Sequence, residues 1–191
     1  GVFGIVDYVD EIIGEVLIKT MVTEVFGVSG SGQERSGLLK ILGNQSSLVN
    51  LTDINSSLSG HLLVTGATIF GEALRKAVSI GAIGIVCGGL NYRDFQSITG
   101  NSGPDRNLGS DVGISVLGTE GFGPLPIGDD IFNLLKNYED KFVFINGNSH
   151  ELHLPSPKAD SIISLRKIAV PVSKIPEITT EPVINELRVG A

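Results

Sequence analysis

Residues 61–90, HLLVTGATIFGEALRKAVSIGAIGIVCGGL, contain the pattern that decides the fold. Residues 61–64, HLLV, predict a short strand, and Thr65-Gly66 predicts the tight turn that follows it. Apolar residues then recur at helical spacing, with Thr68 as the predicted N-cap and Gly81 as the residue that ends the helix. Residues 82–87 are apolar on both faces, which is typical of a covered parallel strand. The stretch therefore predicts one βαβ unit.

The flanking sequence predicts three regions. Residues 1–58 predict a glycine-rich β module, with a hairpin loop at residues 29–37. Residues 59–154 predict an α/β domain, and residues 155–191, which hold five of the eight prolines, predict an extended tail. The predicted fold class is α/β or α+β, with a small βαβ-containing sheet and two to three helices.

Further elements are predicted inside the α/β domain. A helix over residues 92–98 would be capped by Asn91, and residues 112–117 would form the third strand. Asp129 and Asp130 would open another helix, where acidic residues suit the helix dipole. A last strand over residues 142–145 would be followed by a turn at Asn146-Gly147.

Composition restricts the class of protein. The 191 residues are 41% hydrophobic, which is enough to bury a core as one domain or as one domain plus a small module. The formal charge of −7, with no basic patch, argues against nucleic-acid binding. No apolar run approaches the ~20 residues of a membrane span. The single cysteine excludes an intrachain disulfide and favours a cytoplasmic location.

Small, polar or acidic residues stand where three of the predicted strands end, and they form the candidate ligand site. If the strands are parallel neighbours, these ends converge, as ligand-binding loops do in parallel α/β sheets. Backbone N–H groups of the paired glycines would approach an anion, and the acidic residue would act as a base or bind a cation. The alternative is that glycines at strand ends only build tight turns. The candidate residues are Thr65, Gly66, Gly88, Gly89, Thr119 and Glu120.

The other candidate motifs have structural explanations. Residues 27–32, GVSGSG, lack the Lys and hydroxyl of a phosphate-binding loop and predict a hairpin loop. His150 and His153 would face opposite sides of a strand, so no metal site is predicted. Cys87 is predicted to be a buried apolar residue, and no cofactor is predicted.

Several blocks of the sequence resemble a group of uncharacterised bacterial proteins. The most specific are residues 84–89, GIVCGG, and 118–123, GTEGFG, within a likeness that covers roughly residues 4–165. The resemblance implies a barrel-sandwich (biotinyl/lipoyl-like) segment followed by a small α/β domain, and it implies no activity. The Met-Lys turn of a biotinylated module is absent, since Lys19-Thr20-Met21 follows an expected strand. Residues 72–86 are also similar to the helix–strand unit of swivelling β/α domains.

Two hypotheses about function follow. The first is a non-catalytic binding or scaffold domain of a larger bacterial cytoplasmic protein, whose partners are other protein domains or subunits. It rests on the lack of a complete catalytic constellation in the sequence. The alternative is an enzyme or sensor that binds a small anionic ligand at the strand ends near Gly88, Gly89 and Glu120.

Overall fold

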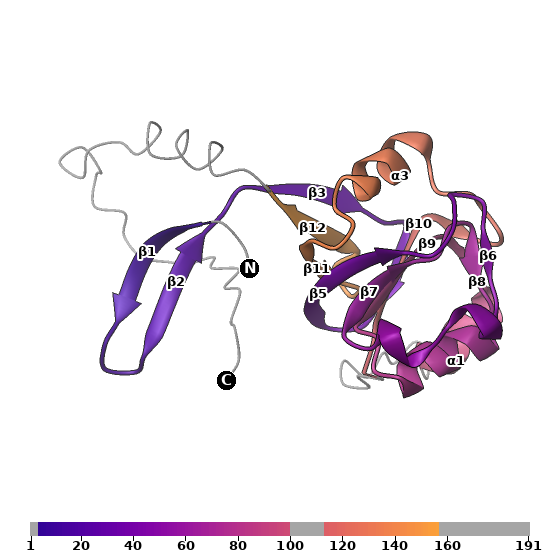
Figure 1. The fold of residues 1–191 in the computed structure, drawn as a ribbon, viewed down its shortest axis with the longest axis horizontal. Coiled ribbons are helices and arrows are strands. Elements are labelled where there is room, and N and C mark those ends of the chain that lie inside the picture. The colour runs from indigo at the N-terminus through magenta and orange to yellow at the C-terminus, as the bar shows by residue number, and fades with distance from the viewer. Residues whose placement is uncertain (1–3, 100–112, 157–191) are drawn as a thin grey trace.

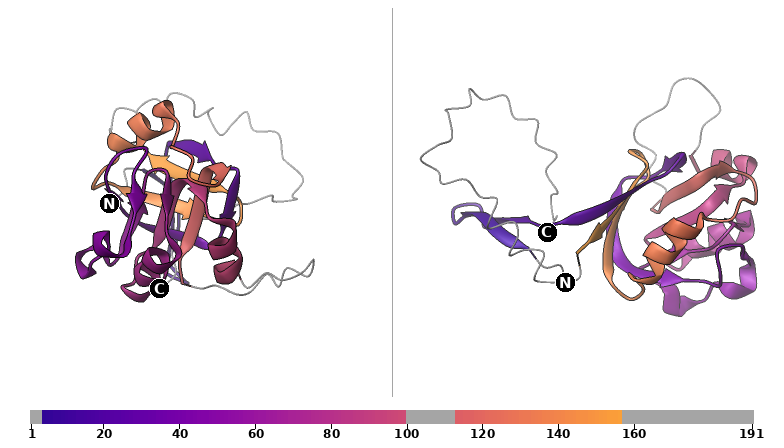
Figure 2. Two further views of the ribbon diagram at one scale, coloured as in Figure 1. Left: turned by 90° about the vertical axis from the view of Figure 1, so that its right-hand side faces the viewer. Right: turned by 90° about the horizontal axis from the view of Figure 1, so that it is seen from above.

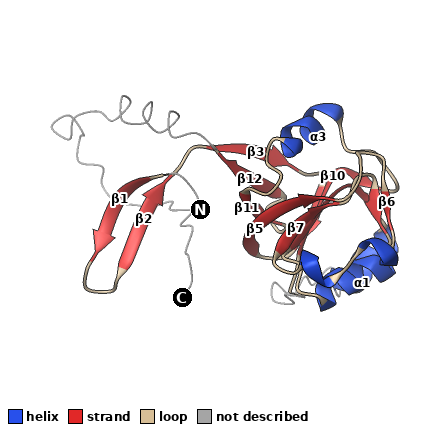
Figure 3. Cartoon of the chain, in the orientation of Figure 1, coloured by secondary structure: helices blue, strands red, loops and turns tan. Residues whose placement is uncertain are grey.

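The computed structural model describes residues 4–99 and 113–156, and Figures 1 and 3 show their arrangement. A curved mixed sheet with three α-helices forms the main body, which shows the predicted α/β or α+β class. The elements in chain order are β1 (Ile5–Asp10), β2 (Glu15–Lys19), β3 (Val22–Phe26), β4 (Ser29–Ser31), β5 (Glu34–Ile41), β6 (Leu48–Val49), the 3₁₀ turns η1 (Leu51–Asp53) and η2 (Ser56–Leu58), β7 (His61–Val64), β8 (Thr68–Ile69), α1 (Gly71–Ser79), β9 (Gly84–Leu90), α2 (Tyr92–Thr99), β10 (Ser115–Phe122), α3 (Asp129–Lys136), β11 (Phe142–Asn146) and β12 (Glu151–Pro155).

The predicted βαβ unit is present as β7, α1 and β9. The two strands pair in parallel, with Leu62 opposite Gly84. Helix α1 ends at Ser79 with Ile80 as its C-cap, and Gly81 follows with a φ of 79°, the left-handed conformation that glycine adopts readily after a helix. The prediction of Thr68 as the N-cap is wrong. Thr68 lies in β8, and Phe70 occupies the cap position without a side-chain hydrogen bond.

Eight strands form the main sheet in the order β3-β12-β11-β5-β7-β9-β10-β4. The two edge strands, β3 and β4, are separated in the chain by only Gly27 and Val28. The Gly27 N–H donates to the His150 carbonyl (2.8 Å), and the Val28 N–H donates to the Gly118 carbonyl (2.9 Å). Gly27 and Val28, which are consecutive, thus bond to segments near the two opposite ends of the strand order. The sheet therefore curls toward closure (Figure 2).

This closure corrects the predicted hairpin loop at residues 29–37. These residues instead belong largely to β4, which pairs with β10, and to the start of β5. A Cβ at Gly27 would lie less than 3.0 Å from the Gly118 carbonyl oxygen, and one at Gly30 would crowd the Val116 and Gly147 carbonyls. The glycines therefore allow close backbone approach where the sheet closes. Because β3, β4 and β5 share the sheet with β7, the sheet also crosses the predicted boundary at residue 58.

Side chains from both faces of the central strands are buried. Along β7, Leu62 and Val64 join one apolar cluster, whereas Leu63 between them joins the other. The first cluster fills the inside of the curved sheet and includes Phe132 and Leu135 of α3. The second packs under α1. This two-sided burial explains the continuous apolar runs of β7 and β9.

The remaining predicted helices and strands are present, and they differ from the prediction mainly in the residues at which they begin and end. The helix after Asn91 runs over Tyr92–Thr99, and the Asn91 Oδ1 accepts from the Arg93 N–H (3.0 Å) as an N-cap should. The strand predicted at residues 112–117 is β10, which begins at Ser115 and continues beyond residue 117 to Phe122. Asp129 and Asp130 begin α3 as predicted. Residues 101–110, NSGPDRNLGS, whose polar sequence predicts a loop, lie outside the described residues, and so does the predicted tail beyond Ser156.

The β1–β2 hairpin projects away from the main body (Figures 1 and 2). Its strands form a separate antiparallel sheet in which Val6 pairs with Ile18 and Val9 with Val16. Every residue of β2 is exposed, and so are the four central residues of β1.

Candidate functional site

The predicted strand-end residues lie on three parallel neighbours. β7, β9 and β10 are adjacent in the sheet, with β9 parallel to both of the others. The Thr65 N–H donates to the Val86 carbonyl (2.9 Å), and the Thr119 hydroxyl donates to the Cys87 carbonyl (3.4 Å). The fold therefore brings the ends of β7 and β10 to the two sides of β9, but this proximity does not form the expected anion site.

The paired glycines have no free donors toward a ligand. The Gly88 N–H donates to the Gly66 carbonyl (2.8 Å), and the Gly89 N–H donates to the Ala67 carbonyl (2.9 Å). A Cβ on either glycine would lie within 3.0 Å of backbone atoms in residues 123–127. The predicted role of these amides in anion binding is therefore corrected. The two glycines let a loop pack directly against β9.

Glu120 supports the adjoining helix. Its Oε1 accepts from the Gly128 N–H (3.1 Å) at the N-cap of α3 and from the Thr119 hydroxyl (3.3 Å). A carboxylate at this position satisfies an N-terminal amide and complements the helix dipole. This contact gives Glu120 a structural role, and its role as a base or cation ligand stays a prediction.

The threonines after β7 are buried. Thr65 is fully buried and Thr68 nearly so, and neither hydroxyl oxygen has a hydrogen-bond partner among the described residues. Gly66 between them adopts a φ of 76°, and a Cβ there would crowd backbone atoms of Ser47. The turn is thus filled by the segment that leads into β6, which leaves no space for a ligand against Gly66.

Cys87 lies in the middle of this region with its thiol enclosed. Its Sγ donates to the Gly89 carbonyl (3.4 Å), and burial raises the pKa of the thiol to about 12. A thiol in this state does not form the nucleophilic thiolate at neutral pH. Cys87 therefore acts as a small core residue, as the sequence predicts.

We expect the Cys87 thiol of the native protein to resist a water-soluble disulfide reagent at pH 7.5 and to react at once in denaturant. Because its pKa is raised from 9.0 to about 12 on folding, the native state holds its proton between those values while the unfolded state loses it. The free energy of unfolding should thus fall as the pH rises above 9. The Cys87→Ala variant, measured by denaturant unfolding across the same range, should lack this component. Rapid labelling of the native thiol would contradict the prediction.

The two histidines lie in different local structures. His153 lies in β12, and its Nε2 is 3.6 Å from the Glu151 carboxylate. His150 precedes the strand, in the loop after Asn146-Gly147, with a φ of 62°. Among the described residues, no group of three His, Cys, Asp or Glu side chains is placed to hold a metal ion.

A surface pocket of about 480 Å³ lies beside the N-terminus of α1, where sequence reasoning placed no site. Its lining comes from η1, α1 and the start of α2, so no local motif could have indicated it. The pocket combines one guanidinium with two carboxylates, and this mixed charge selects no particular ligand class. The lining residues are Asn50, Leu51, Thr52, Phe70, Gly71, Glu72, Arg75 and Asp94.

The β1–β2 hairpin presents the most exposed aliphatic residues of the described chain. At its tip the Ile12 side chain is 95% exposed and that of Ile13 is 69% exposed. The Asp10 carboxylate holds the tip in shape, because its Oδ1 accepts from both the Ile12 N–H (2.9 Å) and the Ile13 N–H (3.2 Å). Exposed aliphatic groups on an ordered turn are typical of a contact surface.

Comparison with known proteins gives no match to any family model, to any curated protein or to any solved structure. The barrel-sandwich resemblance therefore stays a prediction. None of the helices in residues 4–99 and 113–156 has the length and apolar character needed to cross a membrane.

Proposed function

We propose that this chain is a non-catalytic binding or scaffold module that contacts another polypeptide through the tip of the β1–β2 hairpin. The observation that supports the proposal is the exposure of Ile12 (95%) and Ile13 (69%) at the end of a projecting arm. Exposed apolar groups lower the free energy of the system when a partner removes them from water.

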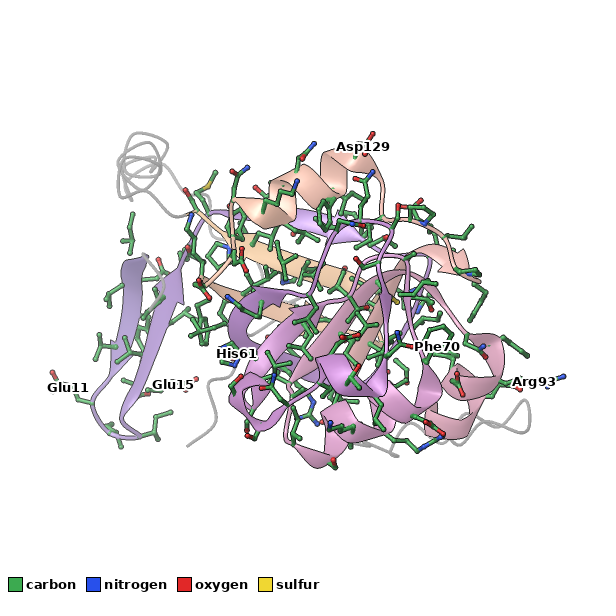
Figure 4. All side chains as sticks on the ribbon, turned by 45° about the vertical axis from the view of Figure 1, so that its right-hand side comes forward. Glu11, Glu15, His61, Phe70, Arg93 and Asp129 are labelled. Carbon is green, nitrogen blue, oxygen red and sulfur yellow. The ribbon has the colours of Figure 1, made fainter. Side chains whose placement is uncertain are left out.

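The charges around the tip indicate the chemistry of the partner. Asp10, Glu11 and Glu15 flank the two isoleucines in the sequence, and Glu11 points away from the molecule at the free end of the hairpin (Figure 4). A complementary surface is an apolar pocket bordered by Lys or Arg side chains. The Asp10 hydrogen bonds fix the turn before binding, which lowers the ordering cost of association.

The interior contacts of the main body support a non-catalytic role. Gly88, Gly89, Glu120 and Cys87, four of the residues that the sequence suggested for chemistry, all have structural partners. The alternative, a small anion held at the strand ends, needs backbone donors that are engaged with carbonyl oxygens.

Site-specific photo-crosslinking in the native host tests the proposal. A photoreactive residue at Glu11 should give a discrete covalent product with another polypeptide, whereas one at Asn133, on the exposed surface of α3, should not. The double variant Ile12→Asp/Ile13→Asp should reduce the product by about tenfold or more, because buried aliphatic anchors dominate such contacts.

Val28→Asp is the matched control, since Val28 is an aliphatic residue of the main body that is 65% exposed. It should leave the crosslink at Glu11 unchanged. An undiminished product from the tip variant, or no product from Glu11 at all, would overturn the proposed role of the tip.

A further inference from the structure

One face of the β1–β2 hairpin is entirely aliphatic. Residues opposite each other in an antiparallel pair lie on the same face, so the pairs Val6–Ile18 and Val9–Val16 form one surface. These four side chains are each 50–55% exposed. We call them the aliphatic face. The other face is mixed, with the pairs Tyr8–Leu17 and Asp10–Glu15 and an ion pair between Asp7 and Lys19 (2.9 Å).

A two-stranded hairpin with an exposed aliphatic face gains stability when another part of the protein buries that face. An isolated two-stranded hairpin is marginal in water and becomes stable when further strands or a packed layer bury its apolar side. Asp10 and Glu15 also stand directly opposite each other, and like charges in that position weaken the pair. The aliphatic face therefore favours an occupant that brings apolar and basic side chains.

The last described residues of the chain lie next to the start of β3. β12 runs antiparallel to β3 as far as the pair Pro155–Val22, and the Ser156 N–H donates to the Met21 carbonyl (2.8 Å). The chain thus leaves the sheet beside the base of the hairpin. A strand of five residues is roughly 17 Å long, a distance that about six extended residues can span. Residues from about 162 onward can therefore reach the whole aliphatic face.

The sequence that follows matches this face in polarity and charge. Ile168, Val170 and Val172 alternate with Ala169 and Pro171, a pattern that would put three branched aliphatic side chains on one side of an extended segment. Pro171 lacks an N–H, which suits packing over a face better than joining a hydrogen-bonded ladder.

The charges are complementary as well. The hairpin carries four carboxylates and one Lys, a net charge of −3, whereas residues 158–174 carry four basic residues and one Asp, a net charge of +3. Residues 175–191 carry three Glu and one Arg, so the basic character belongs to the first half of this C-terminal sequence. Charge complementarity therefore favours residues 158–174 over residues 175–191 as the segment that packs on the hairpin.

We propose that residues 162–172 of this chain pack across the aliphatic face of the β1–β2 hairpin, with Ile168, Val170 and Val172 against Val6, Val9, Val16 and Ile18. The inference goes beyond the proposed function, because it concerns the face of the hairpin and leaves the Ile12–Ile13 tip available to a partner.

Hydrogen exchange of the full chain, read by mass spectrometry, tests this proposal. In Ile168→Asp/Val170→Asp, the amides of residues 5–19 should exchange about tenfold faster or more than in the unmodified chain, because the hairpin loses its cover. The amides of β9 and β10 should be unaffected. Val183→Asp/Ile184→Asp is the matched control, since it places the same two charges in the acidic half of the C-terminal sequence and should leave the hairpin unchanged.

A variant of the hairpin tests the same contact by changing the aliphatic face instead of the C-terminal segment. Val16→Asp/Ile18→Asp should speed tryptic cleavage after Arg166 and Lys167 in the otherwise folded chain. Hairpin exchange that is insensitive to Ile168→Asp/Val170→Asp would overturn the proposal. Hairpin protection that rises with protein concentration, together with a dimeric mass, would overturn it in favour of a second copy of the chain. Loss of the tip crosslink alone would leave this proposal standing.

Discussion

Gly88→Ala is expected to lower the free energy of unfolding by about 4 kcal/mol, or to prevent folding. The added methyl would lie within 3.0 Å of the Leu125 carbonyl oxygen, the Pro126 carbonyl carbon and the Ile127 nitrogen. All three are backbone atoms of the loop that crosses β9, so no side chain can rotate to make room. Relief would require the loop to move as a unit, which would also disturb the entry to α3.

Urea unfolding of matched alanine variants measures this effect. Gly128→Ala is the control, because the nearest atom to its new methyl would be the Asp130 carboxylate oxygen at 2.9 Å, the end of a flexible side chain. Its cost should be about 1 kcal/mol or less, the usual difference between glycine and alanine at an N-cap. A Gly88→Ala variant as stable as the Gly128→Ala variant would show that the loop does not pack on β9 as described.

Leu62→Ala and Leu63→Ala should each cost about 3 kcal/mol, although the two side chains point in opposite directions. Both are fully buried, Leu62 in the cluster inside the curved sheet and Leu63 in the cluster under α1. Each substitution removes buried methyl groups and leaves a cavity that a close-packed interior fills only in part.

Leu38→Ala provides the comparison, since Leu38 of the neighbouring strand β5 is 40% exposed and should lose about 1 kcal/mol or less. Denaturant midpoints and slopes for the three variants measure these costs. A sheet with only one covered face would make one of the two β7 variants as mild as Leu38→Ala. That outcome would contradict the two-sided burial of β7.

Sequence reasoning located the βαβ unit because the information there is local. Helical spacing from Ile69 to Val78 and the glycine at position 81 set α1, and the apolar run before Cys87 set the core of β9. The cap at Asn91 and the acidic start of α3 were likewise readable, because a cap depends on residues within one turn of the helix.

The candidate site was only partly predictable. That β7, β9 and β10 lie side by side follows from ordinary parallel α/β topology, but the partners of the glycine amides depend on residues 123–127 and on the turn at 65–67. A glycine that makes room for backbone and one that approaches a ligand have the same sequence signature. Only the positions of distant segments distinguish them.

The sequence by itself therefore determined the class of fold, the helices and the central strands, because periodicity and capping act over a few residues. The tertiary structure alone decided that residues 27–32 close the sheet, that Gly88 and Gly89 pack against a loop, and that the β1–β2 hairpin projects with an uncovered aliphatic face. Those outcomes depend on contacts between segments far apart in the chain. A local sequence pattern does not indicate which distant segment will pack against a given glycine or face.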